Sequence, residues 1–501
     1  MSHPQRLTFK IWASALILTL FWMDAGCTVR KVQKVDPASV NAQQEQIVGV
    51  TTRRGEEVSF DPPGATVRND TLTARVRGVD YTLPVSDVQR FWVERKGTST
   101  LRTIGLVAGI VVGTLVVAAV IIAATKESCP FVYSWDGEKY VFDAEPYGGA
   151  ITRGLERDDY SELEHLRAHD GVYRLLFTNE VDETQFTNSA ELWVIDHPAD
   201  ARIVADEAGL LYGLRSLSPP LSAVDRKGND LLPWLRSTDL RIWEPEAVAD
   251  PDGAVRQEIV LTFSRPEDQT QARLIVNAAT GLWGSYMIKK MVELRGRDAP
   301  SWLASLGPNS PGLGSLEQWI AQEEIYRLKI EVEEPDGWHV RGSIPGGGPF
   351  IAEDRLISLD VSRVRGNRVR IRLRPPYGFW ALNSFSMAYD AGEKVSIKRV
   401  QPSSAKTSDE RDVLPELISQ DDRYYAMPNI GDRAEVRFAA PGETPGMNRT
   451  VFLHSRGWYE LHLNTKRAPD TKLLEKIAGA PDGAARYAAA QFSEWQAGRR
   501  K

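Results

Sequence analysis

The segment from Ile104 to Ala124 contains 21 consecutive residues without a charge and is rich in Val, Ile, Ala and Gly. About 20 such residues cross a bilayer as a helix, and the segment is too long for a buried strand. The sequence therefore predicts a membrane-embedded helix within residues 103–125, with a buried helix of a soluble domain as the alternative. Gly105, Gly109 and Gly113 recur every four residues, so they would form a face that a second helix can approach closely. We expect helix packing and self-association through this face.

A shorter apolar run lies near the N-terminus. Arg6 and Lys10 precede a stretch of uncharged, mostly apolar residues, Ile11 to Met23. This order is typical of a secretory signal. Ala25-Gly26-Cys27 follows and resembles the lipobox of bacterial lipoproteins, although Asp24 stands where that motif usually has an apolar residue. The resemblance implies cleavage before Cys27 and lipid attachment to it; the alternative is an uncleaved signal anchor.

The two apolar segments make opposite predictions about topology. Basic residues before Ile104 favour a cytoplasmic location for residues 28–102 and an outside location for the C-terminal part. A cleaved signal would instead place residues 28–102 outside. Both features agree on an anchored protein, and we expect the bulk of the chain to be periplasmic or extracellular.

The remaining sequence predicts a mainly β protein. Short alternating segments separated by Gly, Pro and Asp-Gly turns are typical of β-sandwiches. We expect a small N-terminal β-module, the Gly-rich apolar helix, and two β-sandwich-like domains with a helical insertion and C-terminal helices. A helix from Ser315 to Tyr326 would have Ser315 as its cap. The expected parts are 1–27 (signal), 28–45 (tether), 46–102 (β-module), 103–125 (apolar helix), 126–280 (β-rich domain), 281–325 (helical connection), 326–465 (β-sandwich domain) and 466–501 (C-terminal helices).

A row of arginines marks one predicted strand. Side chains two residues apart on a strand point the same way, which places these four arginines on one face: Arg368, Arg370, Arg372 and Arg374. One interpretation is contact with an anionic glycan, lipid head group or acidic partner. The other is pairing with acids on a neighbouring strand, for which Glu331 and Glu333 have the matching alternation.

Motifs for catalysis or metal binding are missing from the sequence. We find no Gly-x-Ser-x-Gly nucleophile motif, and no nearby His marks Cys129 as an activated thiol. His454 and His462 fall on adjacent predicted strands, but we expect no metal site and no cofactor. With 61 basic against 67 acidic residues, the chain also lacks the basic character of a nucleic-acid binder.

Two aromatic segments complete the prediction of location. The residues around Cys129-Pro130 and Trp135-Asp136-Gly137, and the stretch Ser455 to Glu460, are similar to segments of uncharacterised bacterial envelope proteins. We therefore expect a membrane-anchored cell-envelope protein with β-rich binding or scaffolding domains and a glycan or envelope protein as partner. The alternative is an envelope carbohydrate-active enzyme or other hydrolase with a carboxylate site that local motifs do not reveal.

Overall fold

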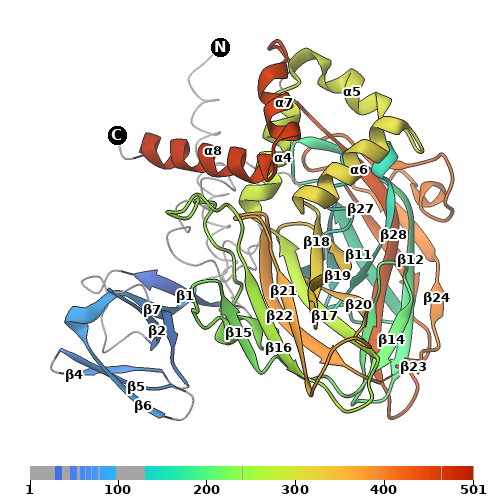
Figure 1. Ribbon diagram of the computed structural model, residues 1–501. Helices are drawn as coiled ribbons and strands as arrows, with labels where there is room; N and C mark the ends of the chain where they lie inside the picture. The colour runs from blue at the N-terminus through green and yellow to red at the C-terminus, as the bar shows by residue number, and fades with distance from the viewer. Residues whose placement is uncertain are drawn as a thin grey trace, which may run out of the picture. The chain divides into compact units, whose positions relative to one another are not determined.

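The computed structural model describes residues 29–35, 46–53, 57–61, 64–68, 70–76, 79–97 and 130–499, except 240, 391 and 464 (Figure 1). The expected lipid-attachment residue Cys27, the expected helix 103–125 with Gly105, Gly109 and Gly113, and Cys129 lie outside these residues. Within the described part, none of the helices combines the length and the hydropathy needed to cross a membrane.

The first of two compact units is a small β-module, as expected. Its apolar core contains Ile47, Phe60, Leu72 and Phe91. The expected tether 28–45 is wrong in part, because residues 29–35 form β1, a strand whose backbone pairs with that of β7 (residues 88–97) despite its polar sequence. One sheet has the order β1 (Val29–Val35), β7 (Val88–Gly97), β2 (Gln46–Thr52), β3 (Glu57–Ser59), and the other β4 (Thr66–Arg68), β5 (Thr71–Val76), β6 (Val79–Pro84).

The second unit comprises residues 113–501 and contains a first pair of sheets packed face to face. Their shared core includes Phe177, Leu192, Val436 and Leu453. One sheet has the order β10 (Arg157–Glu162), β28 (Asn448–Leu461), β12 (Glu183–His197), β24 (Lys398–Val400), with β26 (Tyr425–Met427) also on β12. The other has the order β25 (Pro402–Thr407), β27 (Arg433–Ala439), β11 (Val172–Thr178), β8 (Phe131–Trp135), β9 (Tyr140–Ala144).

A second group of sheets is formed by the chain between residues 202 and 394. Alternate side chains of its central strands are buried, as in β18, whose Leu328, Ile330 and Val332 are fully covered. The five-stranded sheet has the order β15 (Ser222–Asp225), β16 (Ile259–Ser264), β21 (Arg368–Leu373), β18 (Arg327–Glu334), β19 (Gly337–Pro345). The three-stranded sheets are β20 (Glu353–Asp360), β17 (Gln271–Thr280), β22 (Trp380–Ala388), and β13 (Arg202–Ala205), β14 (Leu211–Leu214), β23 (Glu393–Lys394).

The mainly β fold is confirmed, but the expected domain boundaries at 126–280 and 326–465 are wrong. The first pair of sheets combines residues 131–197 with 398–461, and the second group is inserted between them. The central ladder joins β12 to β28, from Glu183 opposite Leu461 to His197 opposite Asn448. Local alternation indicates a strand but does not indicate its partner, so sequence order suggested two consecutive domains.

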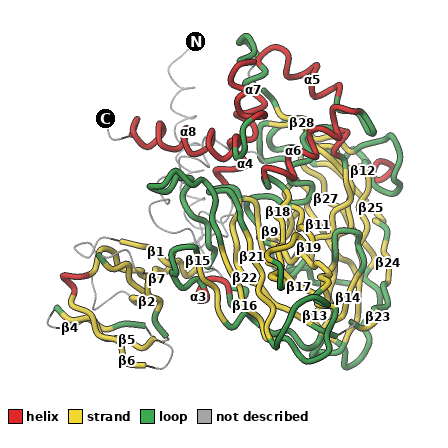
Figure 2. Tube along the Cα trace, in the orientation of Figure 1, coloured by secondary structure: helices red, strands yellow, loops and turns green. Residues whose placement is uncertain are grey.

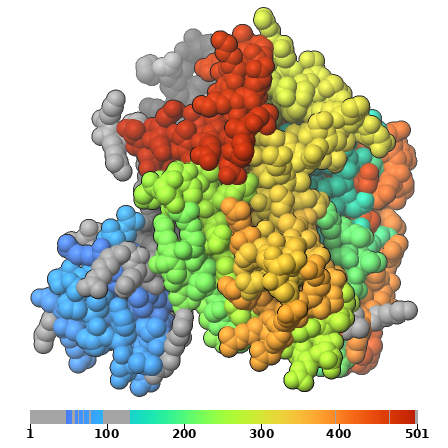
Figure 3. Space-filling model, viewed as in Figure 1, coloured from blue at the N-terminus to red at the C-terminus, as the bar shows by residue number. Residues whose placement is uncertain are grey.

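Five helices gather at one end of the sheets in this unit (Figure 2). The expected cap Ser315 is wrong: Ser310 caps α6, accepting a hydrogen bond from the backbone N–H of Leu313 at 3.2 Å, and Pro311 opens the helix. In Figure 3 the red C-terminal helices lie against the yellow segment that contains α6. The helices are α4 (Leu282–Glu293), α5 (Ala299–Ser305), α6 (Pro311–Glu323), α7 (Thr471–Gly479) and α8 (Gly483–Arg499); the short α3 (Leu232–Leu235) lies elsewhere, beside β15 and β22.

Candidate functional site

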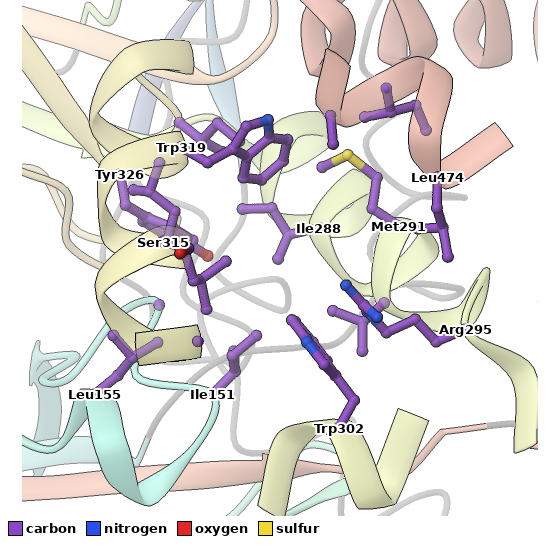
Figure 4. Close-up of a pocket in the computed structure, with 18 residues that line it drawn as sticks. Ile151, Leu155, Ile288, Met291, Arg295, Trp302, Ser315, Trp319, Tyr326 and Leu474 are labelled. Atoms are coloured by element: carbon purple, nitrogen blue, oxygen red, sulfur yellow. The ribbon is translucent and has the colours of Figure 1, made fainter. Parts of the chain in front are cut away.

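The helices enclose a cavity of about 480 Å³, which we call the apolar cavity (Figure 4). Three helices each contribute side chains spaced three or four residues apart, which is the spacing of one helical face. From α4 come Ile288, Met291 and Val292; from α6 come Ser315, Leu316, Trp319 and Ile320; from α7 come Leu474, Ile477 and Ala478. The loop before β10 completes the wall with Gly149, Ile151 and Leu155.

Arg295 is the one charged residue among those that line the apolar cavity. Its guanidinium carbon lies 3.7 Å from the centre of the Trp302 ring, and Figure 4 shows both side chains directed into the cavity. Partial burial lowers the pKa of Arg295. Within the described residues this guanidinium forms no ion pair, and the aromatic ring that it contacts is that of Trp302.

Trp319 also lines this cavity, and its indole N–H is buried in the wall. The indole nitrogen of Trp319 is buried and has no hydrogen-bond acceptor among the residues that the structure describes. A buried N–H without an acceptor carries a desolvation cost of about 1–3 kcal/mol. The apolar cavity therefore combines one charged group, the guanidinium of Arg295, with an otherwise mostly apolar surface.

A second cavity of about 500 Å³ adjoins the first, and we call it the polar cavity. Both cavities are lined by Gly149, Leu155, Ile320 and Tyr326, which therefore form the partition between them. A Cβ atom on Gly149 or on Gly346 would lie 2.9 Å from the Tyr326 ring. Because neither glycine has a side chain, the backbone can approach the Tyr326 ring closely at both positions.

Two carboxylates of the polar cavity, Asp158 and Asp159, form hydrogen bonds and ion pairs with protein groups. Asp159 accepts backbone N–H bonds from Tyr147 at 3.1 Å and Tyr160 at 2.9 Å, and Arg355 lies 3.5 Å away. Asp158 lies 2.9 Å from His454 Nε2 and 2.7 Å from Arg456. Although burial raises it, the pKa of Asp158 is lowered overall by these two partners.

His454 and His462 do not belong to adjacent strands, so that expectation is wrong. β28 runs through Leu461 as one strand, and His462 directly follows it. Burial lowers the pKa of His454, but hydrogen bonds to Asp158 and Glu191 outweigh it and raise that pKa overall. The ring of His454 is stacked on Tyr160 with 4.9 Å between centroids.

Glu162, on β10, shares one guanidinium with a second carboxylate. Arg202 Nη2 lies 2.8 Å from Glu162 and 3.0 Å from Asp354. One positive charge cannot compensate two buried negative charges. Burial raises the pKa of Glu162 to about 8, so this carboxyl holds a proton near neutral pH.

Three arginines of the row predicted from the sequence lie on β21, and Arg374 directly follows this strand. None of the four lines the apolar cavity. Arg370 binds Glu333 at 2.7 Å and Arg372 binds Glu331 at 2.6 Å. Arg374 lies 4.0 Å from Glu258. These ion pairs favour the interpretation that neighbouring strands neutralise the row, which also contains the exposed Arg368.

One described group has ligand atoms close enough for a metal ion: Glu334, Asp336 and His339 on the β18–β19 hairpin. Two arginines form ion pairs with these carboxylates. Arg363 binds Glu334 at 3.1 Å and Asp336 at 2.9 Å, and Arg341 also pairs with Glu334. The cluster therefore serves as an ion-pair network of the hairpin.

Arg295, Trp302 and Trp319 were not among the functional residues expected from the sequence. The spacing of Ile288, Met291 and Arg295 is a helical stripe that the sequence does contain. Such a stripe indicates a buried helix face, and it gives no sign that the faces of three helices leave space between them.

No protein-family model matches this sequence, and no curated protein matches it. Among solved structures, a β-porphyranase of glycoside hydrolase family 86 from Bacteroides plebeius aligns with 48% of this chain and 37% of its own, at 8% identity and a TM-score of 0.14. A glycoside hydrolase family 31 α-xylosidase from Xanthomonas citri aligns with 86% of this chain and 36% of its own, at 9% identity and a TM-score of 0.16. The chain thus spans little more than a third of either enzyme, and likenesses this weak carry no argument about activity.

Proposed function

We propose that this chain is a membrane-anchored bacterial cell-envelope protein whose C-terminal unit binds an apolar ligand. The lipobox-like Ala25-Gly26-Cys27 and the apolar segment Ile104–Ala124 support the location. The observation that carries the binding role is the apolar cavity of about 480 Å³. Ligand pockets have this size and are mostly apolar with a few placed polar groups.

Binding without catalysis is supported by the state of the carboxylates in the polar cavity. Glycoside hydrolysis uses a pair of carboxyl groups, one as acid and one as base or nucleophile. Asp158 and Asp159 both face the polar cavity and both have protein partners for their oxygens. We therefore favour the binding role over the hydrolase, for which none of the observed contacts gives specific support.

A photo-crosslinking experiment tests this proposal in native membranes of cells that express the full chain. The probe is a twelve-carbon alcohol with a diazirine in its chain, and the labelled peptides are mapped by mass spectrometry. We expect labelling within Leu282–Glu293 and Pro311–Glu323. Ile288→Trp fills the cavity and should reduce labelling at least fivefold, whereas Ile430→Trp, at an exposed site, should leave it unchanged. Equal labelling in the two variants, or none of these peptides, would overturn the proposal.

A further inference from the structure

We infer that the ligand of the apolar cavity is an amphiphile with an anionic head, whose carboxylate or phosphate oxygens bind Arg295. This inference rests on the proposed function and specifies its ligand class. The guanidinium of Arg295 lines the cavity and has no ion pair among the described residues. A half-buried cation is costly unless it is paired, and a planar guanidinium binds two oxygens of one head group side by side.

Trp302 fixes the direction in which Arg295 offers its donors. The ring lies against one face of the guanidinium, with 3.7 Å from its central carbon to the ring centre. The N–H groups of a guanidinium lie in its plane, so they stay available while the face is covered. The stacked pair therefore forms a preorganised cationic group at the cavity wall.

The remainder of the wall specifies an apolar tail. Ile288 and Met291 on α4 and Leu316 on α6 present only carbon and sulfur atoms to the cavity. Each buried methylene of a chain gains about 0.8 kcal/mol. Trp319, labelled on another side of the cavity in Figure 4, adds aromatic carbon surface to the same wall, since its indole nitrogen is buried.

The polar cavity beyond Tyr326 determines the orientation of the ligand. Its lining contains three arginines and six carboxylates, namely Glu156, Asp158, Asp159, Asp206, Glu207 and Glu317. This excess of negative charge disfavours an anionic head on that side of the partition. The head is therefore expected at Arg295 and the tail between α4, α6 and α7.

The test compares two diazirine probes of equal chain length, a fatty acid and the corresponding alcohol, in membranes containing the full chain. Arg295→Gln removes the charge, and Arg297→Gln is the matched control at an exposed arginine two residues away. Each probe is compared between variants, so differences in membrane partitioning cancel. We expect Arg295→Gln to reduce labelling by the acid about tenfold and labelling by the alcohol less than twofold, with Arg297→Gln equal to wild type for both.

Competition on the wild-type chain keeps the inference testable if Arg295→Gln does not fold. Laurate or dodecyl phosphate should displace the acid probe at least tenfold better than dodecanol or dodecyltrimethylammonium. Which of the two anions competes better distinguishes a carboxylate head from a phosphate head. Equal competition by dodecanol, with cavity labelling retained, would overturn the anionic head but leave the proposed function intact. Loss of all cavity labelling would overturn both.

Discussion

Arg295 and Trp302 form a stacked pair in which the guanidinium carbon lies 3.7 Å from the ring centre, inside a mostly apolar cavity. The pair joins the end of α4 to α5, and both residues come from the helical segment between β17 and β18. Because no described carboxylate binds the guanidinium, its N–H groups remain available to an anionic group of a ligand, as we infer above.

Replacing the aromatic face should weaken binding while leaving the charge. Trp302→Leu removes the stacking surface, so Arg295 loses its fixed orientation. Cation–π contacts are worth about 0.5–2 kcal/mol, so we expect the labelling by the acid probe to fall by about threefold to tenfold. The ring of Trp338, on β19, makes a comparable contact with the guanidinium of Arg372 on β21. Trp338→Leu removes this contact and should leave labelling unchanged. A similar loss in both variants would point to a general effect on stability.

Gly149→Ala should destabilise the unit through the partition between the cavities. Gly149 has φ +85°, and an added Cβ would lie 2.9 Å from the Tyr326 ring. Gly137 has φ +107° with open space around it, so Gly137→Ala incurs only the backbone strain, about 1–3 kcal/mol. We expect Gly149→Ala to cost about 1–3 kcal/mol more, measured from the midpoints of chemical unfolding. Equal midpoints for the two variants would contradict this account of Tyr326.

The free energy of unfolding should fall as the pH rises, because Glu162 loses a proton. Its pKa is about 8 in the folded protein and 4.5 in its ordinary state, so the folded state holds an extra proton between these values. The contribution of this proton to the free energy of unfolding is complete below pH 4.5. It is lost as the pH rises towards 8, by up to about 1.4 kcal/mol per pH unit. Glu162→Gln should flatten this slope, and Glu460→Gln, at an exposed carboxylate on β28, should preserve it. A wild-type stability that is constant from pH 5 to 8 would exclude the buried proton.

The nested chain order predicts that residues 126–280 do not fold alone. In that fragment β12 would lack β28, and β11 would lack β27, which together form the sheets of the first pair. We expect the fragment to be digested rapidly by protease and to lack near-ultraviolet dichroism, whereas residues 126–501 should resist digestion. A fragment that resists protease and unfolds cooperatively would contradict this prediction and support two consecutive domains.

Much of the local structure could be predicted from the sequence. Asp136-Gly137 marks the turn between β8 and β9, and alternation identified β18 and β21 together with the pairing of Arg372 with Glu331. The partner of a long strand could not be predicted, because β12 and β28 are about 250 residues apart and no local signal joins them.

The candidate site was less accessible to sequence reasoning than the strands. Helical spacing on α4 and α6 indicates which residues face inward, but a cavity depends on how closely three helices approach. Arg295 resembles any other arginine at a helix end, where it favourably meets the helix dipole. Only its place beside Trp302 and the absence of an ion pair among the described residues distinguish it.

The most direct test of the central claim is the dissociation constant of laurate for the full chain held in lipid nanodiscs. It should be measured for wild type, for Ile288→Trp inside the apolar cavity and for Ile430→Trp at an exposed position. The account predicts saturable binding that Ile288→Trp weakens at least tenfold and Ile430→Trp leaves unchanged. Equal dissociation constants for the three proteins, or no saturable binding to wild type, would contradict it.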